Sequence, residues 1–421
     1  MTVRRRLAFL GLLGFAFVLP WEDAVVLPQV GSIGRLSGLL FLVLALPQFV
    51  DRGAFVMRRP ALAVVTLAVF TLWSSATLLW TVDPAATTVS VMTLVQLLVM
   101  VALIWQICDT EQRRRAAMQA YVLGSIVAIS SAFVNYSLGQ EVAFGRFAAT
   151  GFDPNDFAVI LALGIPMAWQ LSRSAMFLPA VVNLAYIPLA LVAIVLSASR
   201  GGTIAAGVGL LAVLFGFMRM PRATRRAASA IGVTLLVTLP ITAPLVQALA
   251  ETSLYRLSTI ASRSGDVNLN EREVIWRSGL DALPEHPIVG AGLGAFPSAI
   301  ERTGAAPEVA HNSFLSVLVE TGAVGMLLFA TTLLVVVLPL LRAPSALAVP
   351  NLVLFATLMV AMMPLSWELR KPTWYVLGLL MTCQGAALAP RLYGIALPAI
   401  RSTATSVRAE LSAVDGGRCE R

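Results

Sequence analysis

Charged residues are scarce in this chain. Only 12% of its 421 residues are Asp, Glu, Lys or Arg, whereas 58% are hydrophobic and the mean hydropathy is +0.83. No soluble globular protein of this size has such a composition. The scarcity of charge therefore excludes a soluble enzyme and predicts an all-α polytopic membrane protein.

Cysteine and histidine are also rare. Cys108 and Cys383 lie in or beside apolar segments, and Cys419 lies near the C-terminus, so none is expected to face an oxidising compartment. We expect no disulfide, no metal site and no cofactor. Both histidines, His286 and His311, fall within or beside one long polar segment.

Apolar runs long enough to cross a bilayer account for most of the chain. About 20 apolar residues span a membrane as a helix, because every backbone polar group must be satisfied internally. Twelve such runs are predicted, centred near Leu13, Val43, Phe70, Leu97, Ile126, Leu163, Pro188, Leu210, Leu235, Leu327, Ala356 and Leu380.

The distribution of charge predicts the orientation of these spans. In the twelve-span arrangement one side carries 20 of the 30 basic residues and only 6 acids, whereas the other carries 10 basic and 16 acidic residues. Cytoplasmic loops are enriched in Arg and Lys, so both termini are predicted to be cytoplasmic. The net charge of +8 is then explained by topology and not by binding of nucleic acid.

The predicted organisation has four parts. Residues 1–249 hold transmembrane helices 1–9, and 250–310 form one large periplasmic loop with short helices. Residues 311–390 hold helices 10–12, and 391–421 form a cytoplasmic tail. The N-terminus resembles a signal peptide but has no small-x-small cleavage site, so we interpret it as a retained first helix.

Proline and glycine residues divide the predicted periplasmic loop into segments. Residues Glu251 to Asn270 are polar and without pattern, whereas Glu271 to Leu283 has helical spacing of apolar residues and ends at Pro284. Pro287 to Phe296 contains three glycines at alternate positions and predicts a tight turn. His311 follows, where this loop meets an apolar helix.

Arginines on the periplasmic side oppose the topological bias and need a reason. Arg200 follows Ser197-Ala-Ser199 and precedes two glycines that would let a backbone or a ligand approach. An arginine at the membrane is usually functional; the alternative is a snorkelling interfacial side chain. Arg272 and Arg277 are either site residues or the paired charges of a solvated amphipathic helix.

Other polar residues also allow two interpretations. Arg146 and the run from Gly151 to Asp156 precede the sixth span, where Asp153 or Asn155 would cap a helix. His311 is a candidate general base or a residue of the cap region, and His286 is a plain turn residue. Glu320, nine residues into the tenth span, either pairs with an arginine or is functional. The segment from Trp367 to Lys371 is an interface anchor or a lipid head-group contact.

Several of these pieces together resemble the O-antigen ligase and polymerase superfamily of bacterial envelope glycosyltransferases. The matching pieces are Ser197-Ala-Ser199-Arg200-Gly201-Gly202, Arg272-x-x-x-Trp276, Pro287-Ile-Val-Gly290-x-Gly292-x-Gly294-x-Phe296, and His311-Asn312 followed by Gly322 and Gly325. Ligases carry two threonines after that last glycine, where this chain has Met326-Leu327. The single large loop favours a ligase over a polymerase, because polymerases often have two.

The resemblance implies a GT-C-like enzyme of the bacterial inner membrane with its active site facing the periplasm. Its donor would be an undecaprenyl-pyrophosphate-linked glycan and its acceptor the lipid A-core oligosaccharide, with membrane lipids around it and no metal. O-antigen polymerase and protein O-oligosaccharyltransferase are the alternatives within the superfamily. Outside it, the alternative is a flippase for lipid-linked glycans, which would place charges along a central pathway.

The resemblance also suggests roles for individual residues. Arg200 and Arg272 would bind the pyrophosphate in forked hydrogen bonds, and His311 would take the proton of the acceptor hydroxyl in an inverting reaction. The residues expected to bind substrate are Arg146, Asn155, Ser199, Trp276, Arg277 and Asn312.

Overall fold

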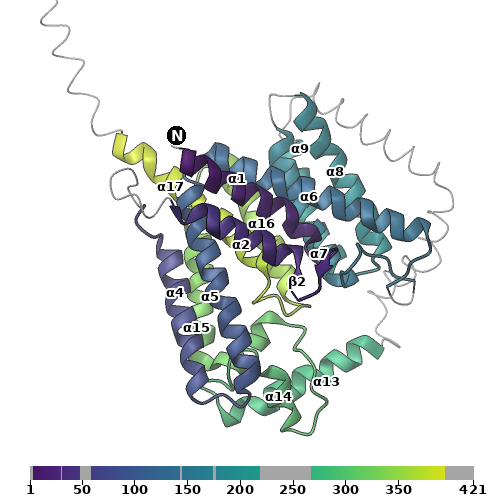
Figure 1. Ribbon diagram of the computed structural model, residues 1–421, viewed down its shortest axis with the longest axis vertical. Coiled ribbons are helices and arrows are strands. Elements are labelled where there is room, and N and C mark those ends of the chain that lie inside the picture. The colour runs from purple at the N-terminus through teal and green to yellow at the C-terminus, as the bar shows by residue number, and fades with distance from the viewer. Residues whose placement is uncertain are drawn as a thin grey trace, which may run out of the picture.

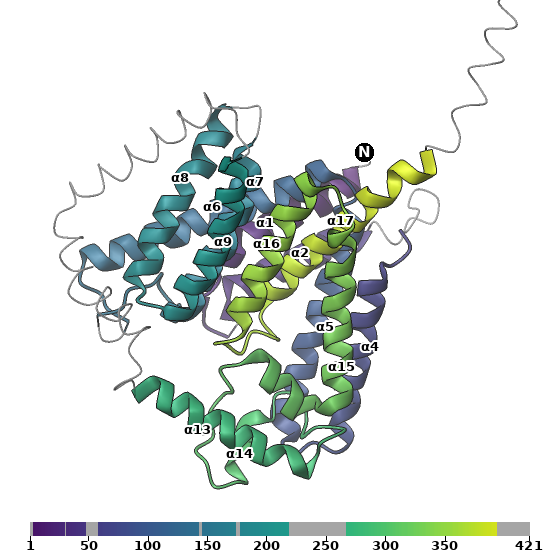
Figure 2. The ribbon, with the colours of Figure 1, turned by 180° about the vertical axis from the view of Figure 1, so that it is seen from behind.

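The computed structural model describes residues 3–29, 31–47, 58–142, 145–173, 177–218 and 267–393. This part of the chain is almost entirely helical (Figures 1 and 2). Its only strands are β1 (Val26–Leu27) and β2 (Gly31–Ser32), a two-residue antiparallel pair in the turn between the first two helices. The all-α prediction is thus confirmed for the described residues, apart from this short hairpin.

Most of the helices belong to two bundles. The bounds are α1 Val3–Val18, α2 Ile33–Ala45, α4 Leu62–Ala76, α5 Pro84–Ile107, α6 Glu111–Ser137, α7 Pro154–Ser172, α8 Phe177–Leu196, α9 Arg200–Met218, α13 Val267–Ala282, α14 Phe296–Glu301, α15 Ser313–Leu341, α16 Ser345–Met362 and α17 Lys371–Tyr393. Helices α4, α5 and α15 form one bundle, and α6 to α9 with α16 form the other (Figure 2). Helices α13 and α14 lie at one end of the molecule (Figure 1).

Within the described residues, six helices are long and apolar enough to cross a membrane: α4 with its 3-10 extension to Leu79, α5, α6, α8, α9 and α15. Eleven of the twelve predicted centres lie in helices of this part of the chain, and the ninth, near Leu235, lies outside the described residues. The chain is therefore a mostly helical polytopic membrane protein, while the total of twelve spans stays a prediction.

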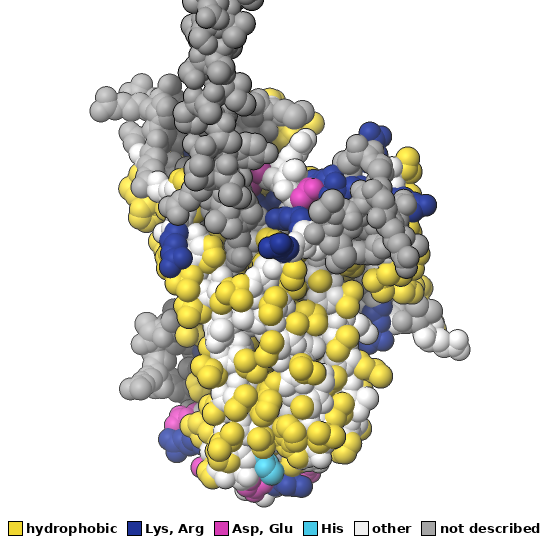
Figure 3. Space-filling view, turned by 90° about the vertical axis from the view of Figure 1, so that its left-hand side faces the viewer, with side chains coloured by type: hydrophobic (Ala, Val, Ile, Leu, Met, Phe, Trp, Pro, Cys, Tyr) yellow, Lys and Arg dark blue, Asp and Glu magenta, His cyan; other side chains and the backbone are white. Residues whose placement is uncertain are grey.

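The surface of the α4–α5–α15 bundle agrees with a lipid environment. Hydrophobic side chains cover the middle of the face in Figure 3, whereas charged groups gather above and below it. The exposed apolar side chains of these three helices include Leu62, Leu72, Val89, Met92, Leu327 and Leu334. Exposed apolar area of this kind is stable only against lipid or another protein.

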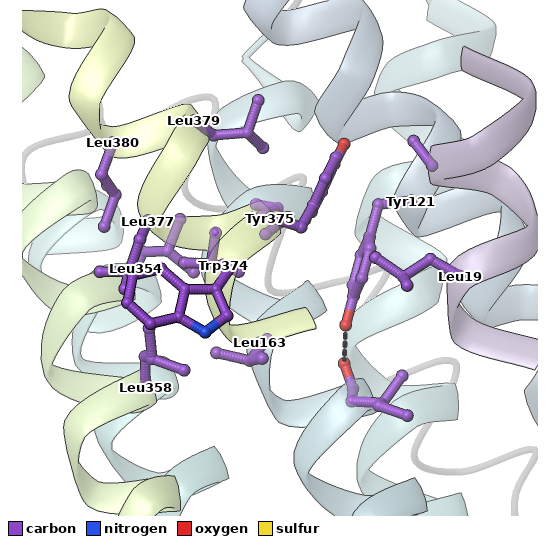
Figure 4. Packing of buried hydrophobic residues seen from close by; sticks show 14 of the residues in the cluster. Leu19, Tyr121, Leu163, Leu354, Leu358, Trp374, Tyr375, Leu377, Leu379 and Leu380 are labelled. Atoms are coloured by element: carbon purple, nitrogen blue, oxygen red, sulfur yellow. Dashed lines mark hydrogen bonds between the residues drawn. The ribbon is translucent and has the colours of Figure 1, made fainter. Parts of the chain in front are cut away.

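Helix α7 is the central element of the second bundle and is buried on nearly every side. It packs against α8 and α9 because small residues let the backbones approach. A Cβ at Gly202 of α9 would lie only 2.3 Å from the Cβ of Ala158 on α7. Where α6 meets α17, the rings of Tyr121 and Tyr375 stack with their centroids 5.7 Å apart. The Tyr121 hydroxyl donates to a backbone carbonyl of α7 (Figure 4).

Helix α15 is not one continuous rod. At Gly322 the backbone has φ +68° and ψ −173°, a conformation that only glycine adopts readily. The segment from Ser313 to Thr321 is therefore a separate half-helix, and the apolar helix resumes beyond Gly322. The sequence predicted a single span here, because hydropathy does not register a change of backbone direction.

We predict that the end carrying α13 and α14 is periplasmic. A cysteine at the exposed Glu301 should then react with a membrane-impermeant maleimide in intact spheroplasts, whereas one at the exposed Arg342 should react only after lysis. Cys108 and Cys383 are buried, so in a protein that also carries Cys419→Ser we expect little reaction of the maleimide with native cysteines. The opposite labelling pattern would reverse the orientation.

Candidate active site

Three elements distant in sequence bring Arg200, Arg272 and His311 together. Arg200 begins α9, Arg272 lies on α13, and His311 precedes α15 by two residues; all three side chains are half-buried. Burial lowers the pKa of Arg272, and the charge of Arg200 lowers it further against the opposing effect of Asp153. Since charges act strongly only over short distances, the three residues predicted from sequence lie in one electrostatic neighbourhood.

The surroundings of His311 favour its uncharged form. Burial lowers its pKa below the ordinary 6.5, and the positive charge of Arg272 lowers it further. Glu308, Asp153 and Asp156 oppose that effect. These effects favour the neutral imidazole, which has one N–H and one ring nitrogen that is able to accept a proton.

The backbone around His311 is held in an unusual conformation. His311 has φ +46°, in the left-handed region, where a residue with a Cβ needs support from its surroundings. Trp276 supplies part of it, since its indole Nε1 donates to the carbonyl of Ala310 at 2.9 Å. Asn312 caps α15 by accepting from the amides of Phe314 and Leu315 at 3.0 and 3.1 Å. Trp276 and Asn312 therefore hold the backbone on either side of His311.

The turn before Arg200 is also strained and supported. Only three residues separate α8 from α9, and the middle one, Ala198, has φ +49°. Ser199 is buried, and its hydroxyl accepts from the amide of Gly202 at 3.2 Å, which caps α9. As predicted, the connection has almost no loop, so Arg200 sits directly at a helix N-terminus, where anions are favoured.

Asn155 connects this turn to the segment before α7. Its Oδ1 accepts from Ser199 Oγ at 3.0 Å and from Arg146 Nη2 at 2.8 Å, and Arg146 Nε donates to the carbonyl of Ser197 at 2.9 Å. Asp153, not Asn155, is the cap of α7. Arg146, Asn155 and Ser199 thus form one network behind Arg200.

The two glycines after Arg200 are used within the protein. A Cβ at Gly201 would lie 2.7 Å from Cγ of Pro364, and Gly202 faces Ala158 of α7. Close approach is required at both positions, as the sequence indicated, but the approaching atoms belong to neighbouring segments of this chain and not to a ligand.

Arg277 has one of the two arrangements that the sequence allowed, and Asp153 has a role that the sequence did not indicate. Arg277 is exposed and pairs with Glu273 four residues earlier at 2.5 Å, the arrangement of a solvated amphipathic helix. Asp153 has more influence than sequence suggested, because it acts on both Arg272 and His311. The sequence identified it only as a cap, since no local pattern connects it to residues 119 and 158 positions away.

The turn from Pro287 to Phe296 fits into the break of α15. Amides of Ala291 and Gly292 donate to the carbonyls of Val319 and Glu320 at 3.0 and 2.8 Å, and the amide of Ala323 donates to the carbonyl of Pro287 at 3.0 Å. The break frees these helix groups, and the turn satisfies them. The glycine-rich motif therefore joins the outer loop to the half-helix that follows His311.

Replacing Gly322 with alanine should destabilise this junction. A Cβ there would lie 2.3 Å from the carbonyl oxygen of Ile288, and φ is +68°. We expect a fall in stability of about 2–4 kcal/mol, read as a lower thermal midpoint of the purified protein. Gly304→Ala is the matched control, because φ is +85° but no atom lies within 4 Å. Equal losses in the two variants would contradict the steric explanation.

The segment from Trp367 to Lys371 does not anchor the protein in the membrane interface. Trp367 is 1% exposed, its indole donates to Asp156 Oδ1 at 2.7 Å, and its amide donates to Ser313 Oγ at 2.7 Å. Arg370 pairs with Asp156 at 3.0 Å, and Lys371 pairs with Glu22. This segment ties the start of α7 to the start of α15; the sequence showed polar and aromatic residues but not their partners.

Comparison with known proteins agrees with this arrangement. Residues 184–330 match a family described as O-Antigen ligase. The match supports the O-antigen ligase and polymerase superfamily. It covers Arg200, Arg272, His311 and the glycine-rich turn, and it does not distinguish a ligase from its relatives. No curated protein matches the chain significantly. Members of this family are glycosyltransferase-like enzymes, and the apolar helices of the chain fit a multi-pass membrane protein.

Proposed function

We propose that this protein is an O-antigen ligase, which transfers a glycan from undecaprenyl pyrophosphate to the lipid A-core oligosaccharide at the periplasmic face of the bacterial inner membrane. The observation that carries this proposal is the electrostatic proximity of Arg200, Arg272 and His311, which come from three separate segments. Two clustered guanidinium groups are suited to a pyrophosphate, and a neutral imidazole beside them is suited to proton transfer.

The arginines would act on the leaving group. As the bond between the anomeric carbon and the phosphate oxygen breaks, its electron pair passes to the pyrophosphate, and negative charge develops there. Planar guanidinium groups donate two parallel hydrogen bonds to such oxygens. Arg200 adds the helix N-terminus of α9, so the charge is stabilised without a divalent cation.

His311 would act on the acceptor. The attacking hydroxyl oxygen forms the new bond to the anomeric carbon from the opposite side, and its proton passes to the imidazole, which inverts the anomeric centre. Arg272 disfavours the resulting imidazolium in the free enzyme. Pyrophosphate bound between the arginines would offset that repulsion, so the imidazole becomes a better base when the donor is present.

The remaining predicted residues have supporting roles in this proposal. Arg146, Asn155 and Ser199 hold the turn of Arg200, and Trp276 and Asn312 hold His311. Each would affect substrate binding through the residue it positions. Arg277 is exposed on α13 and would contact the glycan from the solvent side.

Polymerase and protein O-oligosaccharyltransferase activities use the same donor and differ in the acceptor. The test is therefore reconstitution of the purified protein with a lipid-linked glycan and, in parallel, lipid A-core, a second lipid-linked glycan or an acceptor protein. We expect transfer to lipid A-core. Transfer to another acceptor alone would assign the chain to a relative, and movement of the donor across the bilayer without transfer would indicate a flippase.

We predict that Glu308→Gln shifts the acidic limb of the activity profile to lower pH. Glu308 is exposed and raises the pKa of His311, so removing its charge lowers that pKa further. In native protein, kcat/KM should fall as pH drops through the lowered pKa, below about 6.5, because the protonated imidazole cannot accept a proton. Glu301→Gln, also exposed in the same loop, is the control. An unchanged limb in Glu308→Gln would remove His311 from the pH dependence.

A further inference from the structure

Glu320 and Glu368 meet inside the protein behind the glycine-rich turn. Glu320 lies on the half-helix of α15 and Glu368 in the segment before α17, and their side chains are 3% and 7% exposed. Ser316 lies between them, with its Oγ 3.1 Å from Glu320 Oε1 and 2.9 Å from Glu368 Oε1. The proposed transfer reaction uses neither carboxyl group.

The number of hydrogens at this contact is decisive. A serine hydroxyl has one hydrogen and so donates fully to one of the two carboxyl groups. If both groups were ionised, one would face the lone pairs of the hydroxyl, and two negative charges would lie close together in a medium of low dielectric. A single proton on one carboxyl group removes both conflicts, since that group then donates to Ser316.

The surroundings indicate which group holds the proton. Glu320 Oε2 accepts from the amide of Gly294 at 2.7 Å, and the amide of Phe296 also bonds to this carboxyl. Such bonds stabilise the ionised form. Glu368 Oε2 is buried without a hydrogen-bond partner, which costs far less for a neutral carboxyl than for a charged one. Burial raises the pKa of Glu368 above 4.5, but burial acts on both carboxyl groups, so the hydrogen-bond partners and not burial distinguish them.

The charged groups around the pair agree with this assignment. Arg370, from the same segment as Glu368, is already paired with Asp156 of α7 at 3.0 Å. Lys371 is paired with Glu22. From the outer loop, Glu320 is met by the backbone amides of Gly294 and Phe296. Glu368 also has its own backbone amide and Ser313 nearby. Ser313, however, donates its hydrogen to the carbonyl of Leu365 at 2.8 Å. The contacts that favour a negative charge are therefore better at Glu320, which accepts from two amides of the outer loop.

We propose that Glu368 holds a proton and donates it as a hydrogen bond to Ser316, which donates in turn to the Glu320 carboxylate. This series of hydrogen bonds connects three parts of the molecule: the segment before α17, the half-helix that follows His311, and the outer loop at Gly294. Glu320 and Glu368 are thus positioning residues that set the half-helix against the loop. The proposal is independent of the transferase function, because its test measures a proton and stability.

The proton makes the stability of the fold depend on pH. Because the pKa of Glu368 is raised in the folded state, the folded protein holds a proton that the unfolded chain releases. Stability should therefore fall as pH rises from about 4.5 towards the folded-state pKa. Glu368→Gln removes this dependence, since the amide donates to Ser316 at every pH.

The experiment compares purified full-length native protein with Glu368→Gln, Glu320→Gln and Glu285→Gln, the last an exposed control. Infrared difference spectra across a pH series should show the C=O stretch of a protonated carboxyl in native protein at neutral pH. We expect Glu368→Gln to lose this band and Glu285→Gln to keep it. A band absent from native protein, or kept in Glu368→Gln, would overturn the proposal.

Thermal unfolding provides the second measurement and does not depend on the infrared assignment. Glu368→Gln should match the native midpoint near pH 4.5 and exceed it at neutral pH. Glu320→Gln should lower the midpoint at neutral pH by about 5 °C or more, because the amides of Gly294 and Phe296 and the hydroxyl of Ser316 lose their charged acceptor. Equal loss in both variants, or a greater loss in Glu368→Gln, would contradict the direction of these hydrogen bonds. If Glu320→Gln does not fold, the spectra of the native protein and Glu368→Gln still decide.

Discussion

Arg200→Lys and Arg272→Lys are each expected to lower the rate of glycan transfer by about 10²–10³-fold, with the protein still folded in the membrane. Lysine keeps the positive charge but lacks the planar fork that bonds two phosphate oxygens at once. Both arginines are half-buried, so solvent cannot easily replace the lost hydrogen bond. Alanine variants should be at least as impaired, because they also lose the charge.

The measurement is the initial rate of transfer by reconstituted protein, with donor affinity determined separately. Arg302→Lys is the matched control, because Arg302 is exposed at the same end of the molecule and has only a long 3.8 Å contact with Glu285. We expect that variant to transfer at the native rate. Near-native activity in both Arg200→Lys and Arg272→Lys would show that these arginines do not clamp a pyrophosphate.

The sequence was sufficient to predict eleven helices in the described part of the chain and the short connection before Arg200. Spans are local properties, because about 20 consecutive apolar residues decide each of them. The turn at Ser197 to Arg200 was predictable for the same reason: two apolar runs leave no room for a longer loop. One boundary differed, since α13 begins at Val267 and not at Glu271, because apolar periodicity marks a packed face and not the start of backbone hydrogen bonding.

The features that sequence could not predict all depend on contacts between distant segments. The break at Gly322 is stabilised by hydrogen bonds to a turn 28 to 36 residues earlier. The sequence predicted Trp367 as an interface residue. In the structure its indole donates to Asp156, which lies 211 residues away in sequence. From the sequence, Glu320 either paired with an arginine or was functional; in the structure it meets backbone amides, and a second glutamate through Ser316. Periodicity and motif spacing carry no information about such partners.

His311→Asn should reduce transfer by about 10²–10⁴-fold while leaving donor binding near native, because the base is lost but the arginines remain. Asparagine is the informative substitution, since His311 has φ +46° and asparagine tolerates the left-handed region better than alanine does. Loss of activity in this variant therefore reports the missing imidazole and not a rearranged backbone.

The matched control is His286→Asn, which removes the other histidine from the same outer loop and should leave the rate unchanged. Glu320 is the rival base on this side of the membrane, but its carboxyl is 3% exposed and is held by Gly294 and Ser316, so an acceptor hydroxyl cannot reach it without opening the turn. A His311→Asn protein that transferred glycan at the native rate, beside a stably folded but inactive Glu320→Gln, would move the base to Glu320. We expect the reverse, because His311 is half-buried, neutral and beside the arginine that would bind the leaving group.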